Sequence, residues 1–257
     1  MQKTMYILPV LLLLYLQPVV AQHCNLVQQT VVRHNAEDER LGSDRKNITT
    51  YHYDAYNRLD SMVTETNEVF TWQYSGDTIT VQNSTGNTQT INVYLPDERR
   101  RTAALITVTF YINDSTGQVS PVADTTVSSY MYAPDGTLVE TITLSNRSYK
   151  NGRIKYNWVN GNKIAEEYGD LRNHTQQRQL YEYYTDMPYQ QLFPNQQAPT
   201  DYSRNLVKRS VLEVNNRPVM TIEFTYDFNA QDLVTRMTSL NVQNNQKTYT
   251  TFVYDCR

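Results

Sequence analysis

The sequence predicts an all-β protein: an antiparallel meander of about fourteen to sixteen strands, forming one long curved sheet or a partly closed barrel. Three observations support this prediction. Hydrophobic side chains alternate with a period of two, a short aromatic-turn-aliphatic pattern recurs along the chain, and helical periodicity is absent. The composition agrees, because 21 Tyr accompany 6 Phe and 2 Trp, and a tyrosine ring can pack on a half-buried sheet face while its hydroxyl stays hydrated.

The recurring pattern is the strongest of these observations. Two aromatic residues two positions apart are followed by a polar turn and then by an aliphatic residue that begins the next strand. Each copy therefore predicts a hairpin, a strand followed by a tight turn and a second strand. The copies lie at residues 51–63 (Tyr51, Tyr53, Leu59), 129–142 (Tyr130, Tyr132, Leu138) and 224–237 (Phe224, Tyr226, Leu233), with looser copies at 74–79 and 156–168.

Two segments between the copies are informative. Residues 103–112, AALITVTFYI, alternate strictly, which predicts a strand buried on one face, that of Ile106 and Val108, and partly on the other. Residues 185–203 contain three prolines and no strand pattern. We expect a long loop there, either a lid that plugs the open end of the sheet or a ligand-binding segment.

The N-terminal residues predict export. Residues 1–21 combine Lys3, an apolar stretch and Ala21, which is the pattern of a secretory signal peptide. We therefore expect residues 22–257 to form a single β-meander domain, since no Pro/Ser-rich linker interrupts them.

Cys24 and Cys256 are the only cysteines of the chain. In an exported protein an even count predicts a disulfide, and this one would join the first strand to the last. A lipid anchor at Cys24 is disfavoured, because His23 stands where lipoprotein signals carry a small residue.

Charge argues against nucleic acid as a partner. The formal net charge is -3, whereas phosphate binding requires a concentrated positive field. The cluster Arg99, Arg100 and Arg101 follows two acidic residues and is best explained as a solvated loop.

No catalytic motif accompanies the strand pattern. The sequence contains no nucleophile elbow, no zinc-binding H-E-x-x-H and no glycine-rich phosphate loop. The four histidines show no metal-ligand spacing, so no cofactor and no metal are predicted. Glu166 and Glu167 are adjacent in a strand, and we expect them to point to opposite faces.

Aromatic residues remain as candidate ligand contacts. Tyr189, Phe193, Trp72 and Trp158 could form a platform for a sugar or another flat ligand. For the two tryptophans, ordinary cross-strand packing is the competing explanation.

Two resemblances follow from these motifs. The Tyr-x-Tyr-Asp copies resemble the tyrosine-aspartate repeats of rearrangement-hot-spot proteins. YNWVNGNKI at 156–164, SRNLVKR at 203–209 and the terminal Tyr254-Asp255-Cys256 resemble an uncharacterised exported family of gut-type Gram-negative bacteria, a domain of unknown function with a porin-like fold. This second resemblance covers most of residues 47–256 and implies a porin-like barrel without an assigned reaction.

We therefore expect an exported, non-catalytic β protein of the periplasm or cell surface that binds a glycan, a lipid or an envelope protein. Two alternatives stay open: an outer-membrane pore, and a hydrolase with an unrecognised carboxylate pair. The pore is disfavoured because most outward positions would be polar, so the exported chain is not expected to span the membrane.

Overall fold

The structure is a computed structural model that describes residues 24–34, 45–112, 116, 118–119, 123–147, 151–171, 174–189 and 203–256. In these ranges the chain forms sixteen β-strands and no helix. The strands are β1 (Cys24–His34), β2 (Arg45–Tyr53), β3 (Leu59–Thr64), β4 (Val69–Ser75), β5 (Thr78–Thr85), β6 (Thr88–Pro96), β7 (Thr102–Tyr111), β8 (Asp124–Tyr132), β9 (Leu138–Ser145), β10 (Gly152–Val159), β11 (Asn162–Gly169), β12 (Thr175–Pro188), β13 (Asn205–Val214), β14 (Arg217–Phe228), β15 (Val234–Asn241) and β16 (Gln246–Cys256).

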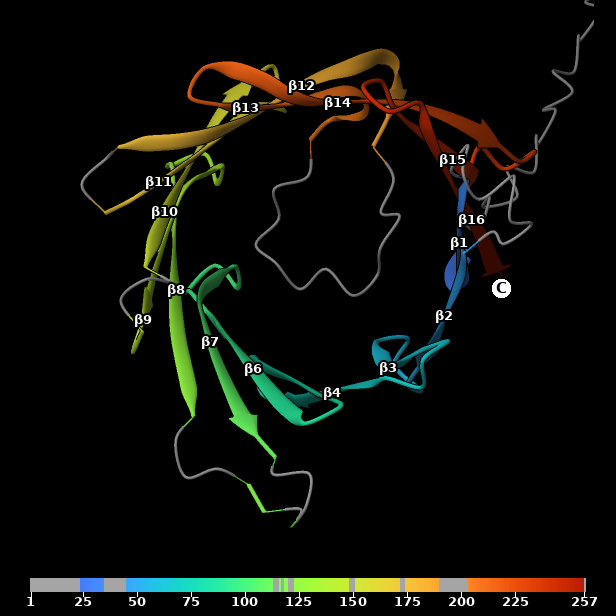
Figure 1. The fold of residues 1–257 in the computed structure, drawn as a ribbon. Helices are drawn as coiled ribbons and strands as arrows, with labels where there is room; N and C mark the ends of the chain where they lie inside the picture. Colours follow the sequence, from blue (N-terminus) through green and yellow to red (C-terminus); the bar gives the residue numbers. More distant parts are fainter. Residues whose placement is uncertain are drawn as a thin grey trace, which may run out of the picture.

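The strands form one closed barrel (Figure 1). Each strand pairs antiparallel with its neighbours in sequence, and β16 pairs with β1 to complete the ring. The predicted all-β antiparallel meander is thus confirmed, and the sheet closes fully. Cys24 lies opposite Cys256 in the β1–β16 register and the two form the predicted disulfide. We call this end of the barrel the disulfide rim and the opposite end the far rim.

The predicted loop begins later than the sequence suggested. Residues 185–188 belong to β12, which ends at Pro188, and β13 begins at Asn205. Residues 190–202 lie outside the described residues.

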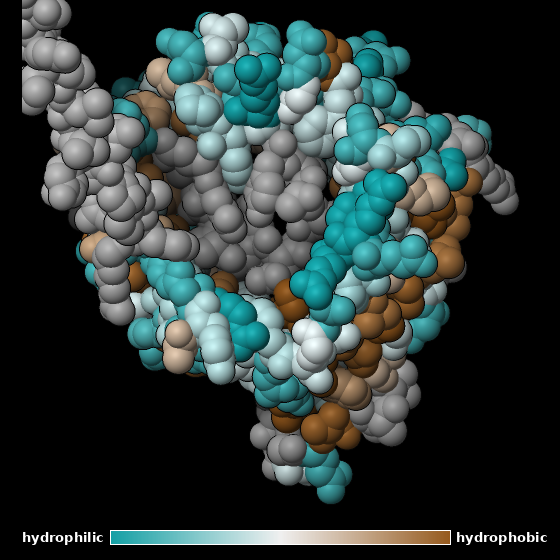
Figure 2. Space-filling model, turned by 180° about the vertical axis from the view of Figure 1, so that it is seen from behind, coloured by the Kyte–Doolittle hydropathy of each residue, from teal (hydrophilic) through white to brown (hydrophobic). Residues whose placement is uncertain are grey.

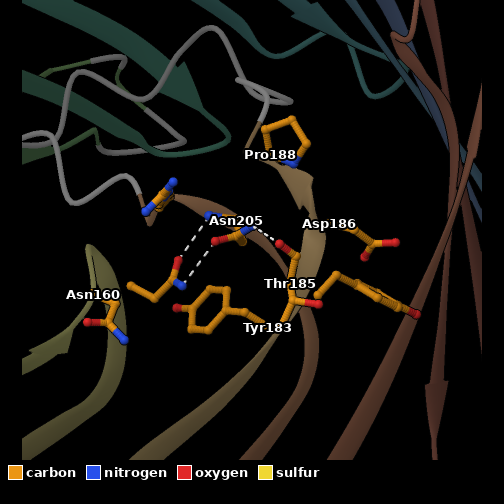
Figure 3. A pocket seen from close by; sticks show the side chains of 9 residues that line it. Asn160, Tyr183, Thr185, Asp186, Pro188 and Asn205 are labelled. Atoms are coloured by element: carbon orange, nitrogen blue, oxygen red, sulfur yellow. Dashed lines mark hydrogen bonds between the residues drawn. The ribbon is translucent and has the colours of Figure 1, made fainter.

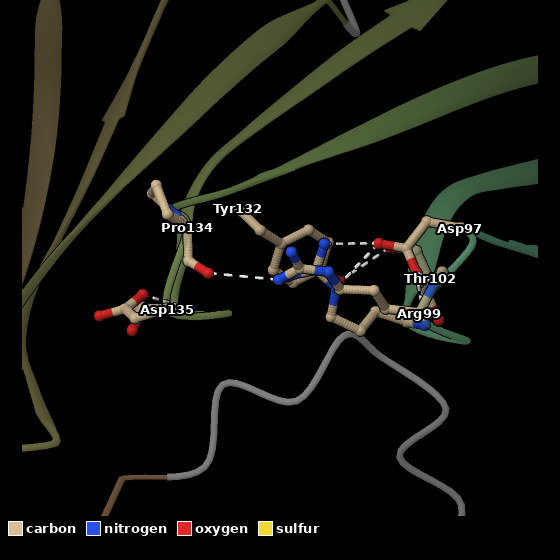
Figure 4. A network of polar contacts seen from close by, with 8 residues as sticks. Asp97, Arg99, Thr102, Tyr132, Pro134 and Asp135 are labelled. Atoms are coloured by element: carbon tan, nitrogen blue, oxygen red, sulfur yellow. Dashed lines mark hydrogen bonds and ion pairs between the residues drawn. The ribbon is translucent and has the colours of Figure 1, made fainter.

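An acidic turn recurs along the disulfide rim (Figure 4). In the β6–β7 turn, Oδ1 of Asp97 accepts hydrogen bonds from the backbone N–H groups of Arg99 and Arg101, both at 2.8 Å, and the Arg101 side chain returns to Asp97 Oδ2. Arg100 adopts φ +61° to complete the turn. The Arg101 guanidinium lies 4.1 Å from the ring centroid of Tyr132. The basic cluster is therefore a loop, as predicted, and it is held by its own carboxylate.

The β2–β3 turn repeats this arrangement residue for residue. Asp54 Oδ1 accepts from the N–H groups of Tyr56 and Arg58 at 2.9 Å, and the Arg58 guanidinium lies 4.2 Å from the Tyr74 ring centroid. Asn57 supplies the positive φ of 61°. The side chain of the first turn residue thus replaces backbone partners that a tight turn leaves unpaired.

Aromatic side chains explain why the sequence pattern repeats. In several strand pairs the backbone ladder ends short of the disulfide rim. There a tyrosine hydroxyl or the Trp158 indole N–H, near the end of the second strand, donates to a carbonyl oxygen of the first strand that lies beyond the ladder. We call these bonds the rim latches. They join Tyr53 to Leu26 O (2.8 Å), Tyr74 to Leu59 O (2.7 Å), Tyr132 to Thr102 O (2.8 Å), Trp158 to Leu138 O (2.8 Å), Tyr226 to Val207 O (2.9 Å) and Tyr254 to Val234 O (2.9 Å).

The third sequence copy requires a correction. Its turn starts one residue after Phe228, where Asn229 accepts from the N–H groups of Gln231 and Leu233. The aliphatic residue that begins the next strand is therefore Val234, which is 0% exposed, and not Leu233.

The lumen has two unlike halves. Strands β1–β6 and β13–β16 contribute an aromatic and aliphatic cluster, whereas β6–β9 turn hydroxyl and amide groups inward. We call the second half the polar wall. Its members bond to one another, as Thr107 does to Asn92 at 2.7 Å and Ser128 to Thr143 at 2.9 Å. The polar wall consists of Thr90, Asn92, Thr107, Thr109, Thr126, Ser128, Thr141 and Thr143.

The predicted alternation of residues 103–112 is confirmed, but its burial is wrong. Thr107 lies in the polar wall, so Ile106 and Val108 point out of the barrel, and no residue of β7 is buried. Figure 2 shows hydrophobic atoms along one outer flank of the barrel.

Candidate functional site

A pocket of about 510 Å³ lies at the disulfide rim, between the β10–β11 turn and the facing ends of β12 and β13 (Figure 3). Figure 3 shows Asn160, Tyr183 and Asn205 on one side of β12 and Asp186 on the other. Its described lining residues are Asn160, Asn162, Tyr183, Tyr184, Thr185, Asp186, Pro188, Arg204 and Asn205.

The β10–β11 turn is tied to β13 by two asparagine side chains. Asn162 Nδ2 donates to Asn205 Oδ1 at 3.1 Å, and the Asn205 backbone N–H donates to Asn162 Oδ1 at 2.9 Å. The Arg204 backbone N–H donates to Gly161 O at 2.8 Å. Gly161 has φ +77°, and a Cβ there would lie 3.5 Å from Arg204 Cβ. These contacts hold the pocket wall in place and leave the Arg204 side chain exposed.

Two tyrosine rings line the pocket. The Tyr183 hydroxyl donates to Lys163 O at 2.5 Å and lies 2.7 Å from Ser203 Oγ. The Tyr184 hydroxyl donates to Phe224 O at 2.8 Å, and its ring meets Tyr226 edge-on with centroids 6.2 Å apart. Because both hydroxyls already make hydrogen bonds within the protein, the two tyrosines offer a ligand only the faces of their rings.

A buried ion pair lies beneath Tyr183. Lys163 Nζ is 2.5 Å from Glu166 Oε1, and both residues are at most 9% exposed. A bulge in the β10–β11 register allows these residues, three apart, to meet on one face. Tyr168 donates to Glu166, and the rings of Tyr156 and Tyr181 lie 5.5 Å from Lys163 Nζ. Paired in this way, the two charges cancel.

Burial also sets the protonation state of the lumen tyrosines. Desolvation raises the pKa of Tyr181 far above its usual range, and the nearby Glu166 carboxylate raises it further. Desolvation likewise raises the pKa of Tyr226, and the neighbouring tyrosines add to the effect. Both stay neutral at physiological pH and can act as hydrogen-bond donors and apolar surface, but not as bases.

The polar groups that remain available are few. Among the described contacts, the side chains of Asn160, Asp186 and Arg204 have no partner. An amide, a carboxylate and a guanidinium can each bond a hydroxyl-rich ligand directly. Asp186 is the one carboxylate among the described lining residues, whereas glycoside hydrolysis uses a pair of carboxyl groups.

The predicted ligand contacts do not gather at this pocket. Trp72 is 5% exposed inside the apolar half, against which Tyr189 packs. The Trp158 indole N–H donates to Leu138 O in a rim latch. Phe193 lies outside the described residues. Trp72, Trp158 and Tyr189 therefore do not line this pocket, and the role of the four aromatics as ligand contacts stays a prediction.

One feature of Trp72 is unusual. Its indole Nε1–H is buried and has no hydrogen-bond partner, a state that costs free energy in a folded protein.

Two further expectations can be compared with the structure. Glu166 points into the barrel, and Glu167 points outward to Arg178 at 3.5 Å, as their adjacency predicts. No group of three metal-ligating side chains occurs in the described parts of the chain. In those same parts, no helix has the length and apolar character needed to cross a membrane.

The pocket residues themselves were not predicted. Asn160 and Gly161 stood in the sequence as an N-G turn within a looser copy of the pattern, and Tyr183 and Tyr184 as part of a tyrosine-rich strand. The pairing of β11 with β12 and of β12 with β13 places this turn beside the start of β13.

Comparison with known proteins agrees with the fold. Residues 27–99 match a family model described as a lipocalin-like domain. The structure is similar to that of a porin-like protein from Bacteroides uniformis, with a TM-score of 0.56 at 12% identity, covering 90% of this chain and 98% of that one. A porin-like protein from Bacteroides vulgatus gives a TM-score of 0.41 at 11% identity, covering 90% and 99%. No curated protein matches the chain.

The fold is therefore that of a porin-like β-barrel, as the sequence resemblance implied. The likeness to rearrangement-hot-spot repeats stays a prediction.

Proposed function

We propose that the chain is an exported, non-catalytic barrel of the cell envelope that binds a glycan at the disulfide rim. The observation that carries this proposal is the rim pocket, which is lined by two tyrosine rings whose hydroxyls already bond to the protein. It is also lined by Asn160, Arg204 and, on the other side of β12, Asp186, whose side chains have no partner among the described contacts. A sugar presents a ring of C–H groups to stack on aromatic faces and hydroxyls that both donate and accept. The polar wall offers further hydroxyls inside the lumen.

An envelope location is supported by the predicted signal peptide and by the disulfide, which persists in oxidising compartments. The bond between Cys24 Sγ and Cys256 supports a chain without a thioether-linked lipid at Cys24.

The outer wall supports an aqueous location over a pore. Arg209 pairs with Glu182 at 2.9 Å on the outer face of β12 and β13, and Arg178 lies between Glu167 and Glu213 on the same flank. A membrane-spanning barrel carries an apolar band around its whole circumference, and charges there are costly.

Titration calorimetry against a panel of envelope and host oligosaccharides tests the glycan proposal. Asn160 has φ +52°, so Asn160→Gly removes the amide without straining the backbone. Combined with Arg204→Ala, it should weaken binding at least tenfold. Asn215→Gly is the matched control, since Asn215 also has φ +52° but lies in the β13–β14 turn at the far rim. If no glycan saturates the wild type, or if the double variant binds as tightly as the control, the proposal is wrong.

A lipid is the second candidate, favoured by one specific observation. The unpaired Trp72 Nε1–H lies in the apolar half of the lumen, and a carbonyl or carboxylate of an acyl ligand would supply its missing acceptor. The lipocalin-like match at residues 27–99 includes this strand, and such barrels enclose ligand cavities. Displacement of a fluorescent fatty-acid probe, with Trp72→Phe as the variant, tests it; a probe that does not bind the wild type excludes this candidate.

A further inference from the structure

One outer flank of the barrel has its polarity inverted. Strands β6–β9 place the polar wall inside, so most of their aliphatic residues point outward. The β-ladder register aligns four of them in one row across the four strands, Val93 with Ile106, Val127 and Leu144. We call the outward set the apolar flank. It consists of Ile91, Val93, Leu95, Ala104, Ile106, Val108, Val127, Met131, Ile142 and Leu144.

Three residues of the apolar flank are exposed to solvent, and the other seven are half-buried. Leu144 is 51% exposed, Met131 39% and Val127 37%. Figure 2 shows hydrophobic atoms gathered along this side of the barrel, with hydrophilic and intermediate atoms between them. Single exposed aliphatic residues are ordinary, but a contiguous patch on a monomer marks an interaction surface.

We propose that the apolar flank is the interface between two copies of this chain. None of its ten residues is Lys, Arg, Trp or Tyr, the side chains that anchor proteins at lipid headgroups. Branched aliphatic residues on a twisted sheet instead suit packing against a second sheet face. Because the patch is confined to one flank, two copies related by a twofold axis cover each other and leave nothing exposed for a third.

The size of the patch indicates a weak dimer. The ten residues of the flank, each occupying about 4.8 Å across the strands and about 6.7 Å along them, cover roughly 320 Å². A standard interface buries about 800 Å² on each partner. The polar residues around the flank must supply the rest, so the dimer should dissociate in the micromolar range. At the edge of the flank Glu140 pairs with Arg153 at 2.9 Å, so the border is not strongly charged.

Sedimentation velocity of the full exported chain at 1 to 200 µM tests the proposal. The wild type should shift from monomer to dimer over this range. Val127→Lys with Leu144→Lys introduces charges at two neighbouring outward positions and should leave a monomer at every concentration. The matched control is Thr225→Lys with Thr238→Lys, an adjacent outward pair on β14 and β15, and it should dimerise like the wild type.

Three outcomes would overturn the proposal. They are a wild type that stays monomeric at 200 µM, a Val127/Leu144 variant that still dimerises, and loss of the dimer in the control. Flotation with phosphatidylethanolamine and phosphatidylglycerol vesicles is run in parallel. A monomer that floats with vesicles, and stops doing so in the Val127/Leu144 variant, would assign the flank to lipid instead. Circular dichroism of each variant establishes that the barrel is intact.

Discussion

Replacing Leu138 by Ala should destabilise the barrel far more than the same change at Leu144, although both leucines lie on β9. Leu138 is 1% exposed and faces the lumen beneath Trp158, whereas Leu144 is 51% exposed on the apolar flank. The substitution removes three carbon atoms, worth about 2.4 kcal/mol at about 0.8 kcal/mol each when fully buried. The cavity left at Leu138 adds about 1 to 2 kcal/mol. We expect a loss of about 3 to 4 kcal/mol at Leu138 and below about 1 kcal/mol at Leu144.

Urea denaturation followed by circular dichroism and by tryptophan fluorescence measures both losses. Protein concentrations below 1 µM keep the proposed dimer dissociated, so that Leu144 reports only on the monomer. Equal losses at the two positions, or a larger loss at Leu144, would mean that the inner and outer faces of β9 are assigned the wrong way round. The polar wall and the apolar flank would then both be wrong.

Three further predictions concern the disulfide between β1 and β16, the rim latches and the effect of alkaline pH. Replacing Cys24 and Cys256 by Ser should lower the free energy of unfolding by up to about 5 kcal/mol, because the bridge closes a loop of 232 residues; urea denaturation measures it, and reduced wild type should match the variant. Tyr226→Phe should cost about 1 kcal/mol in the same assay, since the Val207 carbonyl loses its donor. Burial raises the pKa of Tyr53 and Tyr254 to about 12. The contribution of these two neutral tyrosines to the free energy of unfolding is complete below pH 10 and is lost as the pH rises from 10 to 12. Absorbance at 295 nm should therefore show these tyrosines ionising late and together with unfolding.

Each of the three has an outcome that contradicts it. Unchanged stability without the disulfide would mean that β1–β16 pairing alone closes the ring. A Tyr226→Phe variant as stable as the wild type would mean that water supplies the hydrogen bond to the Val207 carbonyl. Ionisation of all tyrosines near pH 10 in a folded barrel would contradict their burial.

The fold could be read from the sequence because its unit is local. Asp54, Asn57 and Leu59 lie within six residues of one another, so a turn and the start of a strand are written in one short segment. The same locality explains why the predicted start of the strand was one residue too early in the third copy. Both Asp227 and Asn229 follow an aromatic residue, and only the hydrogen bonds that Asn229 accepts from the N–H groups of Gln231 and Leu233 decide which of them begins the turn.

The inner and outer faces could not be read in the same way. An alternating strand such as β7 presents two unlike sides, and the ordinary rule sends the apolar side inward. Ile106 faces outward because Thr107 joins Asn92 in the polar wall, a contact between residues 15 apart. The rim pocket depends on separations longer still, such as the 43 residues between Asn162 and Asn205. A single sequence carries no local signal for either.

The meander also determines how the ring can assemble. Every ladder except one joins strands that are neighbours in sequence, so each hairpin can form soon after its own residues are free to move. The β1–β16 ladder is the exception, and it must wait until the chain has curled through a full turn. The β1–β16 ladder is therefore the seam of the barrel, and it forms last. A circular permutant that joins them and opens the barrel in another hairpin should keep the same ring and merely move its seam.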